Sequence, residues 1–509
     1  MTQVSVSSVA FEPRLRLVRA ETVAEIEAPV KHTGEASRVL GRPLVVDLDG
    51  TLVRSDLLIE TAFSELGARP MSIFDMAAAL FRGKAALKHR LSEPVDFDPA
   101  TLPFDDEVLA FIQRARAEGR PVYLASASNH RLVGAVAAHL GLFTGWFASD
   151  ETNNLAGHAK AERLVEQFGE RGFDYIGNGA ADLPVWALTS KAIAIRAPAR
   201  VARRLTLVSS DIEHLTCQRP SWRTWLKLIR VHQYAKNSLV FVPLLAGHAF
   251  EVSSAIQAML AFVAFSLCAS GVYILNDLID LQDDRRHRTK CERPLASGAI
   301  PLHHGMLAVP LLLLSSLLVA GAVSLPFLGV LLGYFALTTA YSLVLKRKMI
   351  LDVVALALLY TTRVIGGAVA VQVAVSHWLL AFCLCFFMSL ALLKRFVELT
   401  GRVDAQTPDT SSRDYRATDI GMVAALAAAA GFNAVTVLAL YISTDAVSQY
   451  YARPEVLWLV CPVLMYWIAR AMMLAQRRAM HDDPVLFALK DRVSLLTIGL
   501  VGGLVLVAI

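Results

Sequence analysis

The chain has 509 residues, of which 55% are hydrophobic and 18% are charged, and its formal net charge is +5. The hydrophobic content exceeds that of an ordinary soluble protein, and the length leaves room for two or three domains. The six cysteines follow no spacing that is typical of a zinc site or of a disulfide framework, which excludes the small disulfide-stapled proteins.

The hydrophobic residues are concentrated in the second half of the chain. Up to residue 219 charged and apolar residues alternate as in a soluble domain, and beyond residue 237 long apolar runs dominate. We therefore expect a flexible tail over 1–39, a soluble domain over 40–200, a linker over 201–220 and a membrane domain over 221–509. The tail lacks a continuous apolar segment, so we expect no cleaved signal peptide.

Three apolar stretches in the soluble part end in polar residues, as buried parallel strands do. The stretch at 44–48 carries Asp47 and Asp49, the stretch at 121–125 precedes Ser126, and the stretch at 173–176 precedes Asn178 and Asp182. Helical patterns near 105–118, 129–140 and 159–169 lie between them. This alternation predicts a doubly wound parallel α/β sheet, with the polar residues gathered at the carboxyl ends of its strands.

The sequence Asp47-Leu48-Asp49-Gly50-Thr51 matches the DxDGT motif, and residues 40–200 resemble the haloacid dehalogenase (HAD) superfamily of phosphotransferases. The resemblance implies that Asp47 is the nucleophile and that Asp49 is the general acid and base. It further implies that the phosphoryl oxygens are bound by Ser126 and Lys160. The Mg²⁺ ligands that it implies are Asp47, Asp49, Asn178 and Asp182.

One position departs from the superfamily pattern, because Asn178 stands where an Asp is usual and removes one negative charge from the metal site. Two readings remain open, an active phosphatase and a phosphate-binding or scaffolding domain without turnover. Residues 55–104 look helical, best over 74–90, and are expected to form a small cap that selects the substrate.

Nine candidate membrane spans follow, near 238–249, 255–276, 306–323, 326–345, 350–372, 378–393, 420–442, 456–474 and 493–509. The connections at 285–293, 346–348, 394–416 and 475–492 are rich in Lys and Arg, whereas the opposite connections contain only Arg453. By the positive-inside rule the basic connections are cytoplasmic. We expect a multi-pass protein of the inner membrane whose soluble domain is cytoplasmic. The basic residues lie beside the membrane and do not suggest nucleic-acid binding.

Carboxylates gather at the end of the second candidate span. If the helix continues, Asp277, Asp280 and Asp284 lie on one face. Charges at such a place are costly and usually functional, and a hard cation such as Mg²⁺ suits their oxygens. The alternative is a solvated acidic helix end. The basic residues that follow the carboxylates suit phosphate oxygens, which predicts a diphosphate site with the phosphate ligands Arg285, Lys290 and Arg293.

The pattern Asn276-Asp277-x-x-Asp280-x-x-x-Asp284 matches the first acidic motif of the UbiA superfamily of intramembrane prenyltransferases, and residues 220–509 resemble that superfamily. The resemblance implies an all-α bundle of about nine transmembrane helices around a central cavity. It also implies that Mg²⁺ and diphosphate are held by Asn276, Asp277, Asp280 and Asp284.

The second acidic motif of the superfamily is incomplete, because the stretch after the fourth span holds one Asp, Asp352, followed by Arg363. This pattern resembles the decaprenyl-phosphate phosphoribosyltransferase type, which joins phosphoribosyl diphosphate (PRPP) to a polyprenyl phosphate. A lipid monophosphate needs cations rather than a second metal. The candidate ligands for the lipid phosphate are Lys346, Arg347, Lys394 and Arg395, and those for the ribose 5-phosphate are Arg363 and Arg413. Asp352 and Tyr415 are further candidate substrate-binding residues.

Each basic residue could instead be an ordinary loop charge, and the late cluster at 481–484 is interpreted as a helix cap or an interfacial ion pair. The HAD-like domain is expected to remove the 5-phosphate from the lipid product. One alternative is an aromatic prenyltransferase that uses a polyprenyl diphosphate and a 4-hydroxybenzoate-like acceptor. A second is a transporter or receptor with a regulatory phosphate-binding domain. The sequence does not indicate an oligomeric state.

Overall fold

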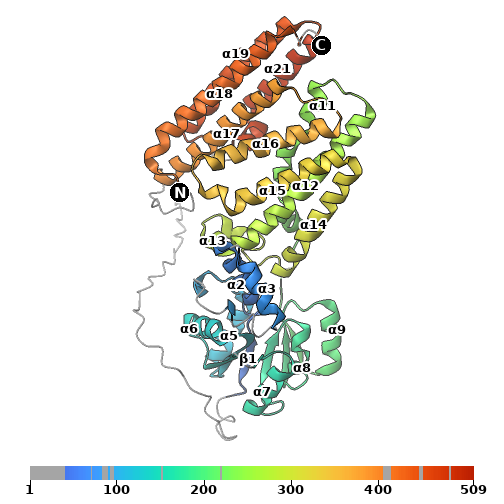
Figure 1. Ribbon diagram of the computed structural model, residues 1–509. Helices are drawn as coiled ribbons and strands as arrows, with labels where there is room; N and C mark the ends of the chain where they lie inside the picture. The colour runs from blue at the N-terminus through green and yellow to red at the C-terminus, as the bar shows by residue number, and fades with distance from the viewer. Residues whose placement is uncertain are drawn as a thin grey trace, which may run out of the picture.

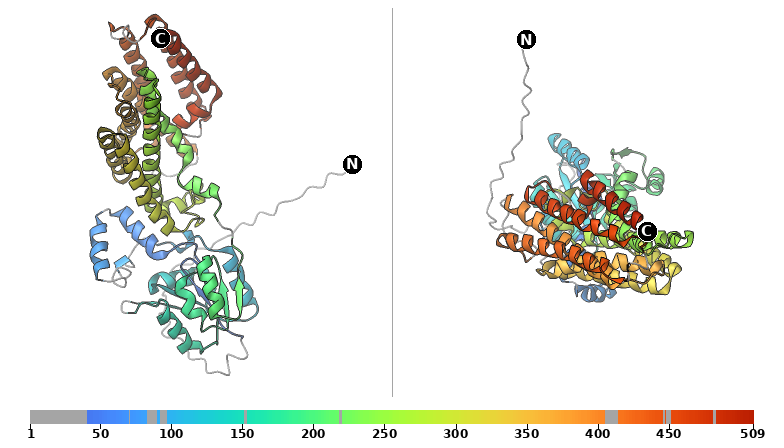
Figure 2. Two further views of the ribbon diagram at one scale, coloured as in Figure 1. Left: turned by 90° about the vertical axis from the view of Figure 1, so that its right-hand side faces the viewer. Right: turned by 90° about the horizontal axis from the view of Figure 1, so that it is seen from above.

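The computed structural model describes residues 41–509 except 70, 83–89, 92–96, 151–152, 218–219, 405–413, 446, 448–450 and 481–482. An α/β unit and a helical unit lie end to end in two perpendicular views (Figures 1 and 2). The α/β unit extends to strand β6 (Ile212–His214), and the helical unit begins at helix α10 (Trp222–Leu228).

Six parallel strands form the sheet of the α/β unit, in the order β3-β2-β1-β4-β5-β6. The other strands are β1 (Leu44–Asp47), β2 (Val122–Asn129), β3 (Gly145–Ser149), β4 (Asp174–Gly177) and β5 (Lys191–Ala194). Strand β1 lies between β2 and β4, and these three are the strands that the polar motifs follow. Their carboxyl ends meet at one edge of the sheet, which brings the three motifs together.

Helices cover both faces of this sheet. Leu44 and Val46 of β1 enter one core, and Val45 enters the other, because successive side chains of a strand point to opposite faces. The first face is covered by α5 (Asp106–Ala117) and α6 (His130–Leu140). The second face is covered by α7 (His158–Phe168), α8 (Leu183–Trp186) and α9 (Ala199–Val208). The expected doubly wound α/β fold is confirmed.

Two helices, α2 (Leu57–Ala68) and α3 (Ser72–Phe81), form a small helical cap between β1 and β2. Helix α2 begins at Leu57 because the carboxylate of Asp56 accepts a hydrogen bond from the backbone N–H of Ile59 at 3.1 Å, as an N-cap residue does. The expected helical stretch at 74–90 begins within α3, and its part at 83–89 lies outside the described residues.

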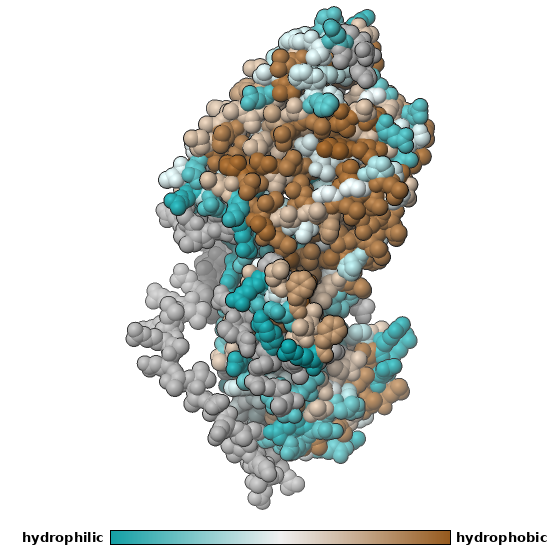
Figure 3. All heavy atoms as spheres, viewed as in Figure 1, coloured by the Kyte–Doolittle hydropathy of each residue, from teal (hydrophilic) through white to brown (hydrophobic). Residues whose placement is uncertain are grey.

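In the described part of the chain, seven helices are long and apolar enough to cross a membrane. The first five are α12 (Val252–Ile279), α14 (Leu302–Val323), α15 (Leu325–Leu343), α16 (Leu351–Ala370) and α17 (His377–Asp404). The other two are the segment Ala417–Ile442, which contains α18 (Ile420–Ile442), and the segment Pro454–Gln476, which contains α19 (Val460–Gln476). A further pair, α20 (Pro484–Lys490) and α21 (Arg492–Ala508), would be an eighth span bent by 81°. Hydrophobic residues dominate the surface over this unit in Figure 3, which fits a multi-pass membrane domain.

Within the described residues, seven or eight spans thus agree approximately with the expected nine. The first predicted span, near 238–249, is instead a 3-10 segment, η3 (Val231–Phe241), followed by the five-residue helix α11 (Val242–Ala246). Pro243 stands in the first turn of α11, and His248 adopts a positive φ of 51° just after it, so the chain cannot continue as one helix there. The expected last span is α21, whose 17 residues are short for a crossing.

Several short elements connect the long helices on the side that faces the α/β unit. They include α13 (Leu281–Arg286), η4 (Lys290–Glu292) and η5 (Leu345–Arg347). Most of the predicted site residues of the helical unit lie in or beside these segments or on α12, α16 and α17. Tyr415 precedes η6 (Ala417–Asp419), and Arg413 lies outside the described residues. Helices α12 and α16 are the most enclosed of the candidate spans. In their most apolar segments 61% and 67% of the residues are buried, against 11% in α14.

Candidate active sites

The first site lies at the carboxyl end of β1. Asp47 ends that strand, is 6% exposed and accepts a hydrogen bond from the hydroxyl of Thr51 at 3.1 Å. Gly50 turns the chain with a φ of +74°, and a Cβ at this position would collide with the side-chain amide of Asn178. The DxDGT sequence thus forms a tight turn that presses against the loop after β4.

Asp49 accepts three hydrogen bonds. The hydroxyls of Ser126 and Ser128 donate to its Oδ2 at 2.9 and 2.6 Å, and the backbone N–H of Leu57 donates to its Oδ1 at 2.8 Å. Ser128 was not among the predicted residues. Its position two residues after Ser126 could have revealed it, because side chains at i and i+2 of a strand share a face.

Lys160 of α7 links the carboxyl ends of β1 and β4. Its ammonium donates to Asp47 at 2.7 Å and to the hydroxyl of Tyr175 at 3.0 Å, and it lies 3.9 Å from Asp182. The carboxylate of Asp182 accepts from Tyr175 at 2.8 Å and from the backbone N–H of Asn178 at 2.9 Å. Tyr175 is an unpredicted member of the site.

The charged side chains Asp47, Lys160 and Asp182 of this site are buried. Burial raises the pKa of Asp47 to about 7, with Lys160 opposing the rise and with Asp182 and Asp49 adding to it. Burial disfavours the charged form of Lys160 as well, but Asp47, Asp182 and Asp49 together outweigh burial and raise the pKa of the ammonium. Three carboxylates around one ammonium leave an excess of negative charge.

Mg²⁺ fits this donor set. The carboxylates of Asp47 and Asp182 supply the hard oxygen ligands that it prefers, and it commonly takes one or two carboxylates together with water and substrate phosphate. Among the described residues, three His, Cys, Asp or Glu side chains do not converge as a preformed cage. The side chain of Asn178 lies against Gly50, and its backbone N–H is engaged by Asp182.

The second site lies where α12 meets α13. Asp277 is 3% exposed and accepts hydrogen bonds from Arg230 and, at 3.1 Å, from Arg293. Asp284 is 2% exposed and also accepts from Arg293, with Lys290 at 3.9 Å. Arg293 therefore bridges two carboxylates seven residues apart, which places Asp277 and Asp284 on the same side of the chain.

Asp280 differs from these two. Helix α12 ends at Ile279 and α13 begins at Leu281, so the helix does not run straight through the motif. Asp280 caps the break and accepts from the ammonium of Lys346 at 3.1 and 3.2 Å. Asn276 donates to the hydroxyl of Ser342 at 3.0 Å. The oxygens of Asp277 and Asp284 suit Mg²⁺, and the cations beside them suit diphosphate.

Arg285 has a different environment from the one that a phosphate ligand needs. Its guanidinium donates to Glu60 of α2 at 2.7 and 2.8 Å and to the carbonyl of Ala296 at 2.9 Å, and its side chain is 3% exposed. Arg285 thus joins the two units of the molecule instead of pointing at the acidic cluster.

A third polar cluster surrounds Arg363 on α16. Its guanidinium donates to the side-chain oxygen of Asn237 at 2.8 Å, to the hydroxyl of Tyr334 at 2.8 Å and to the carbonyl of Leu359 at 2.6 Å. Tyr360 also stacks near it, with its ring centre 5.5 Å away. Arg363 is 5% exposed, and no described carboxylate lies within ion-pair distance of it.

Two further cations lie near this arginine. Lys236 of η3 is 6.0 Å from the ring centre of Tyr360 and donates to Asp483 at 2.9 Å. Lys394 of α17 donates to the same carboxylate oxygen at 2.5 Å. These two cations lower the pKa of Asp483 even though burial opposes ionisation. Asp483 also caps α20 by accepting from the N–H of Val485, so the predicted helix cap and ion pair are confirmed at this residue, while residues 481–482 lie outside the described part of the chain. Lys236 is an unpredicted member of this group.

Asp352 and Arg395 form a buried ion pair. Asp352 is fully buried, accepts from the hydroxyl of Tyr415 at 2.7 Å and lies 2.6 Å from Nε of Arg395. Arg395 is 1% exposed and also pairs with Glu398. Arg395 and Tyr415 thus both contact Asp352, and their role as substrate ligands stays a prediction. The predicted Arg413 lies outside the described residues.

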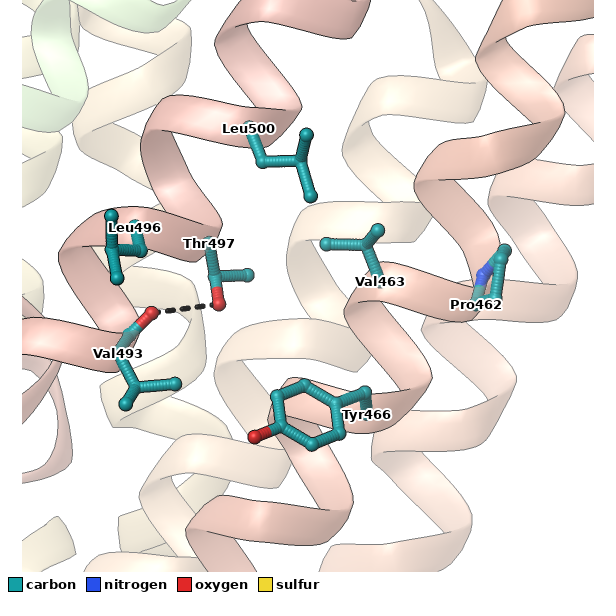
Figure 4. Close-up of a pocket in the computed structure, with 7 residues that line it drawn as sticks. All are labelled: Pro462, Val463, Tyr466, Val493, Leu496, Thr497 and Leu500. Carbon is teal, nitrogen blue, oxygen red and sulfur yellow. Dashed lines mark hydrogen bonds between the residues drawn. The ribbon is translucent and has the colours of Figure 1, made fainter.

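A lateral groove of about 400 Å³ opens between α19 and α21. Tyr466 is the single residue with an ionisable side chain among those that line it, and Figure 4 shows this ring beside apolar side chains. Since it holds no cation or carboxylate, this groove does not suit a phosphate group.

The chain is similar to known proteins over most of its length. Residues 239–496 match the UbiA prenyltransferase family, and residues 44–186 match the haloacid dehalogenase-like hydrolases. An uncharacterized protein of Sinorhizobium fredii is 34% identical over 455 residues, which are 89% of this chain and 88% of that protein. The nodulation protein NoeC of Azorhizobium caulinodans is 37% identical over 55% of this chain and 92% of its own length.

A more limited similarity links the chain to a decaprenyl-phosphate phosphoribosyltransferase of Mycolicibacterium smegmatis. The two are 33% identical over 179 residues, which are 34% of this chain and 56% of that enzyme.

Proposed function

Because this chain belongs to the UbiA prenyltransferase family and carries a HAD-like hydrolase domain, we propose that it performs two successive reactions on a membrane lipid. The membrane domain transfers the 5-phosphoribosyl group of PRPP to a polyprenyl phosphate and releases diphosphate. The HAD-like domain then removes the 5-phosphate, which leaves polyprenyl-phosphate ribose. The limited similarity to phosphoribosyltransferases supports this choice of donor.

One observation carries the proposal: Arg363 is a buried cation to which no described carboxylate is paired, whereas Asp352 is buried beside Arg395 and Tyr415. A prenyl diphosphate donor would need a second acidic, metal-binding pair, and the single Asp352 cannot provide one. A phosphate monoester needs cations instead. Arg363, Lys236 and Lys394 supply these cations for the phosphate of the lipid or the 5-phosphate of the donor.

The donor diphosphate is assigned to the acidic motif. Asp277, Asp280 and Asp284 would hold Mg²⁺, which neutralises the leaving diphosphate when it is bound. Arg230, Arg293 and Lys346 now neutralise these carboxylates, and they can turn to the diphosphate oxygens when a substrate and a metal are present. A phosphate oxygen of the lipid then forms a bond to C1 of the ribose as the bond from C1 to the diphosphate oxygen breaks.

The phosphatase step is assigned to the turn after β1. Asp47 attacks the phosphorus of the 5-phosphate, Lys160 neutralises the phosphoryl oxygens, and Asp49 gives a proton to the departing ribose oxygen. Asp49 then takes a proton from the water that hydrolyses the phosphorylated Asp47. Mg²⁺ on Asp47 and Asp182 would reduce the repulsion between the carboxylate and the phosphate. Ser126 and Ser128 orient Asp49 for both transfers.

Both sites are assigned to the cytoplasmic side of the inner membrane, where the basic loops are expected. Their common chain keeps the second site near the product of the first and raises its effective concentration.

A comparison of labelled donors tests the transferase. Membranes that contain the full chain are supplied with a polyprenyl phosphate and radiolabelled PRPP, or with 4-hydroxybenzoate and a radiolabelled polyprenyl diphosphate. We expect label in the lipid from PRPP and no prenylated aromatic product. Prenylation of the aromatic acid without transfer from PRPP would replace the proposal with an aromatic prenyltransferase. No turnover of either donor would favour a transporter or receptor.

A further inference from the structure

Helix α2 touches both candidate sites with its first turn. The backbone N–H of its first residue, Leu57, donates to Asp49 in the HAD-like site at 2.8 Å. Three residues later, Glu60 accepts two hydrogen bonds from Arg285 of α13, at 2.7 and 2.8 Å. A single short helix therefore contacts a proposed acid–base residue of one site and the segment that carries the acidic motif of the other.

The ion pair of Glu60 and Arg285 is linked to the residues that are proposed to bind the donor. Nε of Arg285 donates to the carbonyl of Ala296 at 2.9 Å, and Ala296 lies three residues after Arg293. Arg293 in turn bridges Asp277 and Asp284. Glu60 is thus connected through one side chain and one short loop to the cation that holds the two carboxylates.

The surface around this ion pair is closely packed. Ile59 and Phe63 of α2 pack against the cluster that contains Leu278, Leu281 and Leu295 of the membrane domain. The side chains of Glu60 and Arg285 are 1% and 3% exposed, so water does not screen the pair.

Backbones also approach closely at this surface. A Cβ at Gly298, where φ is +68°, would lie 2.5 Å from Cβ of Arg54, and one at Gly67 would lie 3.0 Å from Ile279. The two domains therefore meet in a tightly fitted interface at α2, and a change at Glu60 cannot be absorbed by solvent.

We infer that α2 positions both active sites, and that Glu60 is a positioning residue for the transferase. By holding Arg285 and the loop to Ala296, Glu60 sets where Arg293 stands beside Asp277 and Asp284. In the other direction, the docking of α2 holds the N–H of Leu57 on Asp49. The inference rests on the proposed function only for the identity of the donor and does not require that the two reactions be coupled.

The test uses the full chain in lipid nanodiscs and two variants, Glu60→Gln and Arg285→Gln, which keep side-chain size but remove one charge. The matched control is Glu162→Gln, because Glu162 is an exposed carboxylate on α7, a helix at the end of the HAD-like unit away from the membrane domain in Figure 1. Hydrogen exchange of peptides covering 57–63 and 285–298 is measured without substrate. The KM for PRPP and the hydrolysis of p-nitrophenyl phosphate are measured separately.

In both variants we expect at least tenfold faster exchange in the 285–298 peptides, with exchange of the β1–β2 sheet unchanged. We also expect a KM for PRPP at least fivefold higher, a smaller change in the KM for polyprenyl phosphate, and hydrolysis of p-nitrophenyl phosphate reduced threefold or more. The control should match the wild type in every measurement. A variant that merely loses folded protein would lower kcat and leave KM unchanged.

Wild-type exchange in 285–298 and wild-type hydrolysis of p-nitrophenyl phosphate in both variants would overturn the inference. These two readouts need neither PRPP nor a lipid acceptor. If the wild type does not turn over PRPP, the proposed function fails, and the exchange and hydrolysis measurements still decide the role of α2.

Discussion

The ammonium of Lys160 lies 2.7 Å from the carboxylate of Asp47, and both side chains are buried at the carboxyl end of the sheet. Removing one partner of such a buried ion pair strongly destabilises the fold, because the other charge stays buried without compensation. The pair therefore gives a direct test of the HAD-like site.

We predict that Lys160→Met lowers hydrolysis of p-nitrophenyl phosphate at least 100-fold and destabilises the α/β unit by about 3 kcal/mol. Transfer from PRPP should persist at more than half the wild-type rate. The control is Lys191→Met, since Lys191 is partly exposed and forms a surface pair with Glu213 whose loss costs about 1 kcal/mol or less. Equal phosphatase rates in the two variants would argue against a catalytic site at Asp47.

A second prediction concerns Asp105, which caps α5 by accepting from the N–H groups of Glu107 and Val108 and pairs with Arg54 and Arg196. Burial opposes its ionisation, but Arg196 and the other donors outweigh burial and lower its pKa. A lowered pKa stabilises the fold above the unfolded value, and this contribution is lost as the pH falls through the folded pKa.

Asp105→Asn should keep the helix cap, since Asn caps helices as well as Asp does, but it removes the charge that pairs with Arg54 and Arg196. It should therefore lower the Tm of the α/β unit by about 2–4 °C at pH 7, which corresponds to about 1 kcal/mol. The difference from the wild type should shrink as the pH is lowered below the ordinary Asp value of 3.8. Thermal melts followed by tryptophan fluorescence across this range measure it. A constant difference at all pH values would contradict the assigned charge.

The third prediction concerns the acidic motif. Asp277→Asn and Asp284→Asn should each reduce phosphoribosyl transfer at least 100-fold, because each removes a buried carboxylate that Arg293 contacts and that is proposed to bind Mg²⁺. Asp283→Asn is the matched control, since Asp283 is exposed in the same segment. Initial rates over a Mg²⁺ titration distinguish them. If Asp283→Asn is as inactive as the other two, the loss reflects local charge and not a specific site.

The fourth prediction concerns the planar guanidinium group of Arg363. Arg363→Gln should lower transfer at least 50-fold, and Arg363→Lys should restore little of it. An ammonium cannot reproduce the planar set of donors that reaches Asn237, Tyr334 and the carbonyl of Leu359 together. The KM values for PRPP and for polyprenyl phosphate should be measured separately. The substrate whose KM rises is the one whose phosphate group Arg363 binds. Full activity of Arg363→Lys would rule out recognition by the guanidinium.

Local sequence was sufficient to predict much of this molecule. The apolar run of β1 predicted a buried parallel strand because it is covered on both faces, and the motif spacing placed Asp47, Ser126 and Asp182 at one sheet edge. The long apolar helices were equally clear. In each case the signal lies in a periodicity or a motif of a few neighbouring residues.

The contacts that depend on tertiary structure could not be read in this way. Asp483 meets Lys236 and Lys394 from segments far apart in the chain, and Glu60 meets Arg285 across the two domains. Arg395 looked like a free loop cation, but the fold buries it beside Asp352. The break of the helix at Asp280 also has no local marker such as Pro or Gly.

The most direct test of the two-step proposal compares the lipid products of the wild type and of Asp47→Asn. Purified full-length protein is given PRPP and a polyprenyl phosphate, and the lipids are analysed by mass spectrometry. We predict polyprenyl-phosphate ribose from the wild type and its 5-phosphorylated precursor from Asp47→Asn. Absence of any pentose on the lipid in both samples would contradict the transferase, and the same phosphorylated lipid in both would contradict the phosphatase step.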